Sequence, residues 1–285
     1  MLTRIIPLGA GAAHLEAYWL KDSAEFQTGK PRPAVIVCPG GGYMGTSDRE
    51  AEPIALRFLA HGFHAFVLRY SVQTLFPAPM LELAQAVMLI RENAKDWLVD
   101  PDQIAVCGFS AGGHLAASLG VFWDKTFITE PLGARAEQIR PNALLLCYAV
   151  IELEVISNRP FTRDPAGQPV FDDQDVITKL LGGPRPSQAL RDQYRLDLQV
   201  SPATPPTFLW HTADDAVVPA QNALRLAAAL ARHKVPYELH IFETGVHGLA
   251  LADAVTAVPG QPSFVSPDNQ IWVDLALKWL KHRHG

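Results

Sequence analysis

Two patterns of hydrophobic and polar positions alternate along this chain. Short runs of consecutive apolar residues, many of them β-branched, are typical of strands buried on both faces of a parallel sheet. Longer stretches repeat their apolar residues every three to four positions, which is typical of amphipathic helices. We expect strands at residues 34–38, 63–70, 104–109, 143–150, 207–211 and 237–242, and helices at about 48–60, 80–97, 220–233 and 268–281, with a further helix starting near residue 110.

The first 20 residues follow a different pattern, since apolar and polar residues alternate singly. Residues 2–8 and 14–20 are therefore predicted to pair as an antiparallel hairpin, with Gly9 and Gly11 in its turn. Beyond the hairpin, strands alternate with helices. This order predicts an α/β fold: a doubly wound, mostly parallel sheet with helices on both faces.

The pattern weakens between about residues 151 and 206. Proline and glycine are frequent there, an acidic group occupies 172–175, and only two short helical windows stand out, at 176–181 and 187–194. A chain of 285 residues suits one large α/β domain. We therefore interpret residues 1–285 as a single domain and residues 151–206 as a small cap-like insertion.

Composition narrows the classes of partner. The net charge of −5 comes without any basic block, which argues against nucleic acid and anionic membrane surfaces. No apolar run reaches the roughly 18 residues needed to cross a bilayer, and the first residues lack a signal-peptide pattern.

The chain has three cysteines, Cys38, Cys107 and Cys147. Their odd number argues against a disulfide framework, and the absence of C-x-x-C spacing argues against a zinc site. We expect a cytoplasmic protein without metal or cofactor, acting on a small molecule.

The segment Gly108-Phe109-Ser110-Ala111-Gly112 joins an apolar strand to an Ala- and Leu-rich helix. Gly-x-Ser-x-Gly between a strand and a helix is the pattern of a nucleophile elbow, in which glycines allow a close crossing and the serine hydroxyl is exposed. By itself the motif could also be a glycine-rich turn. The flanking strand and helix favour the elbow, and with it Ser110 as a nucleophile.

A serine nucleophile needs a base and an acid, which should follow Ser110 on loops after later strands. The strand at 207–211 leads into Asp214 and Asp215, and the strand at 237–242 leads into His247. We predict His247 as general base and one of the two aspartates as its partner. The other nine histidines have plainer explanations; His114, one helical turn after Ser110, is interpreted as a packing residue.

Four segments together resemble the α/β-hydrolase superfamily, and within it the bacterial carboxylesterases of the acetylesterase and xylan-esterase-like group. They are residues 40–43 (Gly-Gly-Gly-Tyr), 108–113, 211–219 and 245–248. The resemblance implies an oxyanion hole formed by the N–H groups of Gly41, Gly42 and Ala111. It also selects Asp215 over Asp214, because relatives carry the spacing Asp-x-x-Val-Pro. Pro39 departs from the family, where many members have histidine before the glycines.

The resulting hypothesis is a cofactor-independent serine hydrolase that forms an acyl-enzyme on Ser110 and cleaves short-chain, acetyl-like esters. The resemblance suggests acetylated sugars or xylo-oligosaccharides, and a short acyl slot beside Tyr43 would suit them. An amide or peptide-type hydrolase of the same fold is one alternative, because fold does not fix substrate. A non-catalytic binding protein on a hydrolase scaffold is another. A second copy of the chain, forming a homodimer, is a candidate partner.

Overall fold

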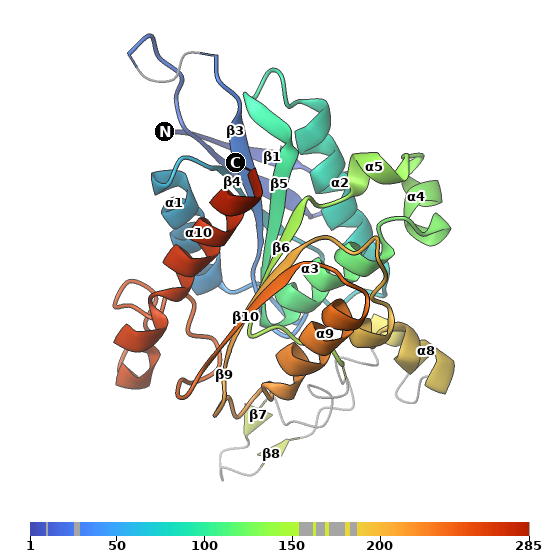
Figure 1. Ribbon diagram of the computed structural model, residues 1–285, viewed down its shortest axis with the longest axis vertical. Coiled ribbons are helices and arrows are strands. Elements are labelled where there is room, and N and C mark those ends of the chain that lie inside the picture. The colour runs from blue at the N-terminus through green and yellow to red at the C-terminus, as the bar shows by residue number, and fades with distance from the viewer. Residues whose placement is uncertain are drawn as a thin grey trace.

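The centre of the molecule is an eight-stranded sheet with the order β1-β2-β4-β3-β5-β6-β9-β10 (Figure 1). The computed structural model describes residues 1–9, 11–25, 29–153, 162–163, 169–170, 180–182 and 187–284. The strands of the sheet are β1 (Leu2–Pro7), β2 (His14–Trp19), β3 (Arg32–Cys38), β4 (His64–Arg69), β5 (Val99–Phe109), β6 (Ala143–Cys147), β9 (Thr207–Thr212) and β10 (Tyr237–Phe242).

Strand directions agree with the predicted mostly parallel sheet. Strands β1 and β2 form the predicted antiparallel hairpin, β2 pairs antiparallel with β4, and all later pairings in this sheet are parallel. In the register, Cys38 on β3 pairs with Gly108 on β5, and Phe109 pairs with Cys147 on β6. Because parallel strands end at the same edge, the loops after β3, β5, β6, β9 and β10 all leave from one edge of the sheet.

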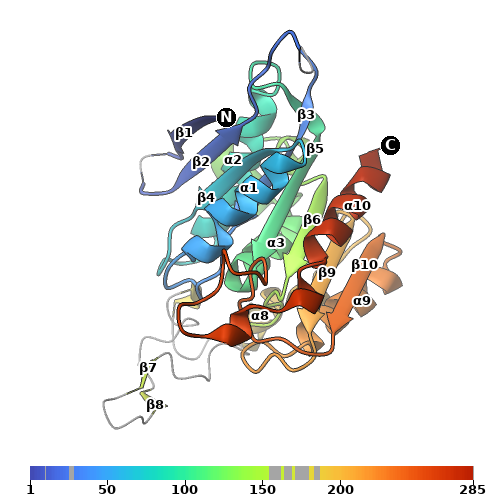
Figure 2. The ribbon, with the colours of Figure 1, turned by 90° about the vertical axis from the view of Figure 1, so that its left-hand side faces the viewer.

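Helices cover both faces of the sheet, as predicted. One apolar core lies between the sheet and the helices α2 (Ala78–Glu92), α3 (Ser110–Phe122) and α9 (Gln221–Arg232). A second core lies between the opposite face and the helices α1 (Glu52–Ala60) and α10 (Trp272–His284), which run side by side across that face in Figure 2. The continuous apolar runs of β3 and β6 are buried because helices pack on both of their faces.

Several predicted boundaries were wrong. The stretch between α3 and Pro141 has two short helices, α4 (Thr126–Leu132) and α5 (Ala136–Ile139), which are too short to show a clear periodicity. The helix expected at 80–97 ends at Glu92, and the last helix starts at Trp272 after two 3-10 turns. Strand β6 ends at Cys147 because Tyr148 has a positive φ of 36°, which breaks the extended backbone.

The helix expected at 48–60 is divided. Asp48–Glu50 form a 3-10 turn, and α1 starts only at Glu52, with Pro53 in its first turn. The Ser47 side chain at the start of this turn makes no capping hydrogen bond. Ala51 between the two pieces has φ −111° and ψ −105°, outside the helical region.

The region expected to form a cap is described only in part. Helix α8 (Gln188–Gln193) confirms the helical window at 187–194, and the Ser187 hydroxyl accepts the Leu190 N–H at its start. Strands β7 (Thr162–Arg163) and β8 (Pro169–Val170) pair antiparallel. The acidic group at 172–175 and most of the window at 176–181 lie outside the described residues. The division into one domain with a cap stays a prediction.

Candidate active site

Ser110 lies between strand β5 and helix α3. Its backbone has a φ of 51°, a conformation that residues other than glycine rarely adopt. Two glycines make this turn sterically feasible. A Cβ added to Gly108 would lie 2.2 Å from the carbonyl oxygen of Gly112, and one added to Gly112 would lie 2.1 Å from that of Cys38. The close crossing that the sequence predicted is therefore present, and it presents Ser110 at the carboxyl end of the sheet.

His247 meets Ser110 from the loop after β10. Its Nε2 lies 2.8 Å from the Ser110 Oγ, although 137 residues separate the two in the chain. The loop is held by Thr212, whose hydroxyl donates to the carbonyl of Gly245 at 2.7 Å. The ring of Tyr148 packs edge-on against the imidazole, with 5.1 Å between centroids and 72° between planes. These contacts leave the His247 side chain 15% exposed, so it remains open on one side.

Asp215 lies on the far side of the imidazole, with its Oδ2 2.7 Å from the His247 Nδ1. Its side chain is fully buried, and its Oδ1 accepts the N–H groups of Val217 and Val218 at 2.8 and 2.9 Å. Burial alone would raise the pKa of Asp215. The contacts with His211 and His247 and the backbone N–H of Val218 outweigh burial and hold this pKa well below its usual value. Asp215 is thus an ionised acceptor facing His247.

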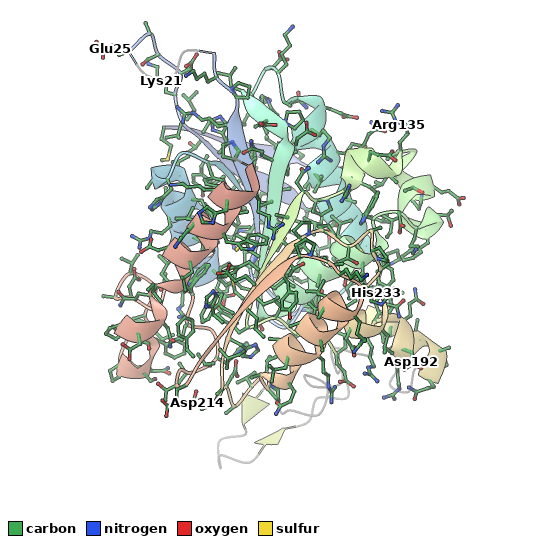
Figure 3. All side chains as sticks on the ribbon, viewed as in Figure 1. Lys21, Glu25, Arg135, Asp192, Asp214 and His233 are labelled. Atoms are coloured by element: carbon green, nitrogen blue, oxygen red, sulfur yellow. The ribbon has the colours of Figure 1, made fainter. Side chains whose placement is uncertain are left out.

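The neighbouring Asp214 has a different role. It projects outward at the rim of the molecule in Figure 3, and its Oδ1 accepts the N–H of Gly245 at 2.7 Å. This contact ties the loop after β9 to the loop that carries His247. The geometry therefore places Asp215 against the imidazole and Asp214 on the loop backbone, which is the arrangement that the family spacing implied.

The glycine segment after β3 lies directly beside Ser110. A Cβ on Gly40 would lie 2.9 Å from the Cβ of Ser110, and the next two residues, Gly41 and Gly42, have φ values of 130° and 62°. In the described part of the chain, no hydrogen bond leads from the N–H of Gly41 or Gly42 to a protein acceptor. Ala111 is the second residue of α3, so its N–H has no acceptor within its own helix.

Tyr43 and His114 form a buried pair behind this segment. The Tyr43 hydroxyl lies 2.9 Å from the His114 Nδ1, and both side chains are at most 1% exposed. Burial lowers the pKa of His114 to about 4, so the imidazole is neutral at physiological pH. These contacts make His114 a packing residue, as predicted. Tyr43 joins the glycine segment to α3, and an acyl slot beside it stays a prediction.

Sequence reasoning missed two residues that support the site, Glu50 and Tyr148. Glu50 falls within the helix expected at 48–60, to which no role was assigned, yet it is 4% exposed and accepts the N–H of Gly40. Tyr148 was expected inside a strand, yet its ring contacts His247. Neither residue belongs to a recognisable motif, so a single sequence offers no signal for them.

Two features of the described residues concern metal ions and membranes. Across the ranges that the structure describes, no three His, Cys, Asp or Glu side chains gather as metal ligands would. No helix in the same ranges is long and apolar enough to cross a membrane.

A mostly parallel eight-stranded sheet with this sharp turn after β5 has the α/β-hydrolase fold. A sequence model of the BD-FAE family matches residues 24–230. The chain therefore belongs to the BD-FAE family.

Comparison with individual proteins agrees with this assignment. The crystal structure of the carboxylesterase Cest-2923 from Lactobacillus plantarum superposes with a TM-score of 0.83 at 31% identity, covering 99% of this chain and 97% of that one. The acetyl ester-xyloside bifunctional hydrolase from Caldicellulosiruptor lactoaceticus gives 0.78 at 35% identity, covering 99% and 96%. The predicted resemblance to carboxylesterases and xylan-esterase-like proteins is confirmed.

Two curated relatives are much longer than this chain. The endo-1,4-beta-xylanase B of Butyrivibrio fibrisolvens is 33% identical over 78% of the chain, which corresponds to 33% of that protein. The acetylxylan esterase of Xylanibacter ruminicola is 27% identical over 75% of the chain and 40% of that protein. The chain thus spans less than half the length of these two relatives.

Proposed function

We propose that this protein is a serine hydrolase that cleaves short-chain carboxylic esters, with Ser110 as nucleophile, His247 as general base and acid, and Asp215 as the group that orients His247. One observation carries the proposal: the continuous chain from Ser110 Oγ to His247 Nε2 at 2.8 Å and from His247 Nδ1 to Asp215 Oδ2 at 2.7 Å. A hydroxyl, an imidazole and a buried carboxylate in this order are the elements of acyl transfer through a covalent intermediate.

The reaction follows from the protonation states. Ionised Asp215 accepts the Nδ1–H of His247, so the Nε2 lone pair faces the Ser110 hydroxyl. His247 removes the hydroxyl proton as Ser110 Oγ bonds to the ester carbonyl carbon, and then donates that proton to the departing alcohol. A water molecule, deprotonated by His247 in the same way, then attacks the acyl carbon. The bond between that carbon and Ser110 Oγ breaks, and His247 returns its proton to Oγ. The products are the alcohol, a carboxylic acid and free Ser110.

Negative charge develops on the carbonyl oxygen in both tetrahedral steps. Gly41 and Gly42 follow Gly40, which packs against Ser110, and Ala111 follows Ser110 itself. Their N–H groups have no acceptor in their own loop or helix, which supports their role as the oxyanion hole. The N-terminus of the 13-residue helix α3 adds a favourable dipole at the same place.

Acetylated sugars or xylo-oligosaccharides are the substrate class that we favour. An acetylxylan esterase and an acetyl ester-xyloside bifunctional hydrolase are among the relatives. Amide hydrolysis on the same site would use the same three residues, and the substrate panel below distinguishes the two. The three cysteines are unpaired and buried, which supports our expectation of a reducing, cytoplasmic location.

The decisive experiment compares wild type with Ser110→Ala on p-nitrophenyl acetate, acetylated xylo-oligosaccharides and a formamide, together with labelling by a fluorophosphonate. We expect ester turnover by wild type, a loss of kcat on the order of 10⁴-fold in the variant and no covalent label on it. A variant that keeps a tenth of the activity would contradict the nucleophile. Faster cleavage of the formamide than of every ester would move the protein to the amidases.

A further inference from the structure

Glu50 is a buried acid that the reaction above does not use. Both of its carboxylate oxygens accept hydrogen bonds, Oε2 from the N–H of Gly40 at 2.8 Å and Oε1 from the hydroxyl of Tyr148 at 2.7 Å. Glu50 is the last residue of the 3-10 turn before α1, in the connection between strands β3 and β4. A buried carboxylate is costly unless its charge is well hydrogen-bonded, so the position calls for an explanation.

The two partners of Glu50 belong to opposite sides of the site. Gly40 begins the glycine segment that lies against Ser110. Tyr148 packs its ring on His247, and its hydroxyl oxygen accepts the N–H of Ala250, three residues after that histidine. Gly40, Glu50, Tyr148 and Ala250 thus form one buried hydrogen-bond chain, which links the loop after β3 to the loop after β10.

The preceding residue reinforces the same link. The guanidinium of Arg49 donates through Nη2 to the carbonyl of Gly248 at 2.8 Å, and through Nε to the carbonyl of Thr256. Gly248 directly follows His247 in the sequence. Arg49 therefore holds the histidine loop directly, whereas Glu50 reaches that loop through Tyr148 and also holds the glycine segment.

The packing around Gly40 leaves little freedom. A Cβ at this position would lie 2.7 Å from the Glu50 Oε2 and 2.9 Å from the Ser110 Cβ, so carboxylate, glycine backbone and nucleophile are in direct contact. The Gly41 N–H follows one peptide later. A shift of the Glu50 carboxylate must therefore move the proposed oxyanion donors relative to Ser110, and small misplacements of such donors are costly for catalysis.

We propose that Glu50 is a positioning residue for the ester-hydrolase reaction, fixing the glycine segment and the His247 loop to each other across Ser110. The proposal rests on the proposed function, since it assigns Glu50 to that reaction. Glu50 touches neither the substrate nor the Ser110 hydroxyl; it acts through Gly40 on one side and through Tyr148 on the other.

The test measures kcat and KM for p-nitrophenyl acetate in wild type, Glu50→Gln, Glu50→Ala, Tyr148→Phe and Glu52→Gln. Each kcat is expressed per serine titrated by a fluorophosphonate, so that misfolded protein does not count. Glu52 is the matched control, because it is an exposed glutamate two residues away. We expect its substitution to leave kcat within about twofold, as is usual for an exposed side chain.

The expected results differ between the variants. Glu50→Gln keeps one acceptor oxygen and should lower kcat per titrated site about tenfold, with KM nearly unchanged. Glu50→Ala removes both acceptors and should lower it about 100-fold, the effect of losing one oxyanion donor. Tyr148→Phe leaves Glu50 in place and should give an intermediate loss, which keeps the proposal testable if Glu50→Ala fails to fold.

Two outcomes would overturn the proposal. If Glu50→Gln and Glu50→Ala matched wild type in kcat per titrated serine and in KM, Glu50 would only support folding. If wild type itself cleaved none of the esters and took no fluorophosphonate label, the proposed function would be wrong and this role would fall with it. The first outcome leaves an active esterase and the second does not, so the two failures are distinct.

Discussion

At the scale of the residue, Asp214 and Asp215 are adjacent in the sequence but make different contacts. Asp214 is exposed and accepts a backbone N–H from Gly245, whereas Asp215 is buried and contacts His247. Their side chains are chemically identical. The difference arises because the turn after β9 directs Asp215 into the protein, where the N–H groups of Val217 and Val218 stabilise its charge.

Separate substitution of the two aspartates tests this difference. Asp215→Asn should lower kcat on the order of 10⁴-fold, because an amide nitrogen facing Nδ1 favours the wrong tautomer of His247. Asp214→Asn keeps an oxygen acceptor for Gly245 and should cost less than about tenfold. Steady-state kinetics of both variants, with circular dichroism as the check on folding, decide the matter. A severe loss in Asp214→Asn with a mild one in Asp215→Asn would reverse the assignment.

His114 makes the stability of the protein depend on pH. Its pKa falls from 6.5 to about 4 in the folded chain because of burial, so between these values only the unfolded chain binds the proton. Lowering the pH from 7.5 to 5 therefore stabilises the unfolded chain, by about 2 kcal/mol if this group acts alone.

Urea unfolding at pH 7.5 and pH 5 measures this effect. The free energy of unfolding should fall less on acidification in His114→Gln than in wild type. His61→Gln is the control, because His61 is an exposed histidine. An equal fall in wild type and His114→Gln would show that His114 is not the titrating group.

At the scale of the element, the crossing of α3 over β3 and β5 fixes the position of Ser110, the proposed nucleophile. Helix α3 is buried along almost its whole length, which its Gly- and Ala-rich sequence permits. Gly112 packs against the carbonyls of Cys38 and Pro39, so the start of the helix touches the strand end that leads into the glycine segment. One helix thereby positions both Ser110 and the proposed oxyanion loop.

Gly112→Ala tests this crossing. In an ordinary helix, alanine is more stable than glycine by about 0.5 to 1 kcal/mol. Here the new Cβ would lie 2.1 Å from the Cys38 carbonyl oxygen and 2.4 Å from that of Pro39, both backbone atoms. We expect the opposite sign: a loss of about 1 to 3 kcal/mol in the free energy of unfolding, with a drop in kcat.

Gly11→Ala serves as the matched control, because a Cβ there meets no atom within 4 Å. Its free energy of unfolding and kcat should stay close to those of wild type. Stabilisation by Gly112→Ala, with activity retained, would show that the helix does not approach the strand as closely as described.

At the scale of the whole molecule, the site exists because parallel strands end at one edge of the sheet. The loops after β3, β5, β9 and β10 bring together residues from 41 to 247, and the register of the sheet sets their relative positions. In the region expected to form a cap, Tyr194 is buried against Phe76 with 4.9 Å between ring centroids.

Acyl chain length tests the size of the substrate pocket. Lipases that act on long chains need a wide apolar groove, and residues 151–206 show no long apolar helical pattern in the sequence. An added methylene contributes about 0.8 kcal/mol only if it is buried, so a short slot should make activity fall with chain length. We expect the highest kcat/KM for acetyl to butyryl p-nitrophenyl esters. A maximum at octanoyl or beyond, with activation at a lipid interface, would contradict this expectation.

Local patterns were sufficient for much of the fold and for proposing Ser110 and His247 as site residues. Continuous apolar runs identify strands such as β3 because a strand buried on both faces can carry only apolar residues. Gly-x-Ser-x-Gly marks the sharp turn at Ser110 because only glycines allow that crossing. The order Ser, Asp, His could be recognised because Ser110 directly follows β5, and Asp215 and His247 lie on the loops that follow β9 and β10.

Only the tertiary structure separated Asp215 from Asp214 by geometry and showed Glu50 as part of the site. In the sequence, Glu50 is one charged residue at the polar start of the stretch predicted as a helix at 48–60. Its burial depends on Gly40 and on Tyr148, which is 98 residues further along the chain. These two contacts of Glu50 depend on how separate strands and loops pack together, so they cannot be predicted from a local sequence pattern.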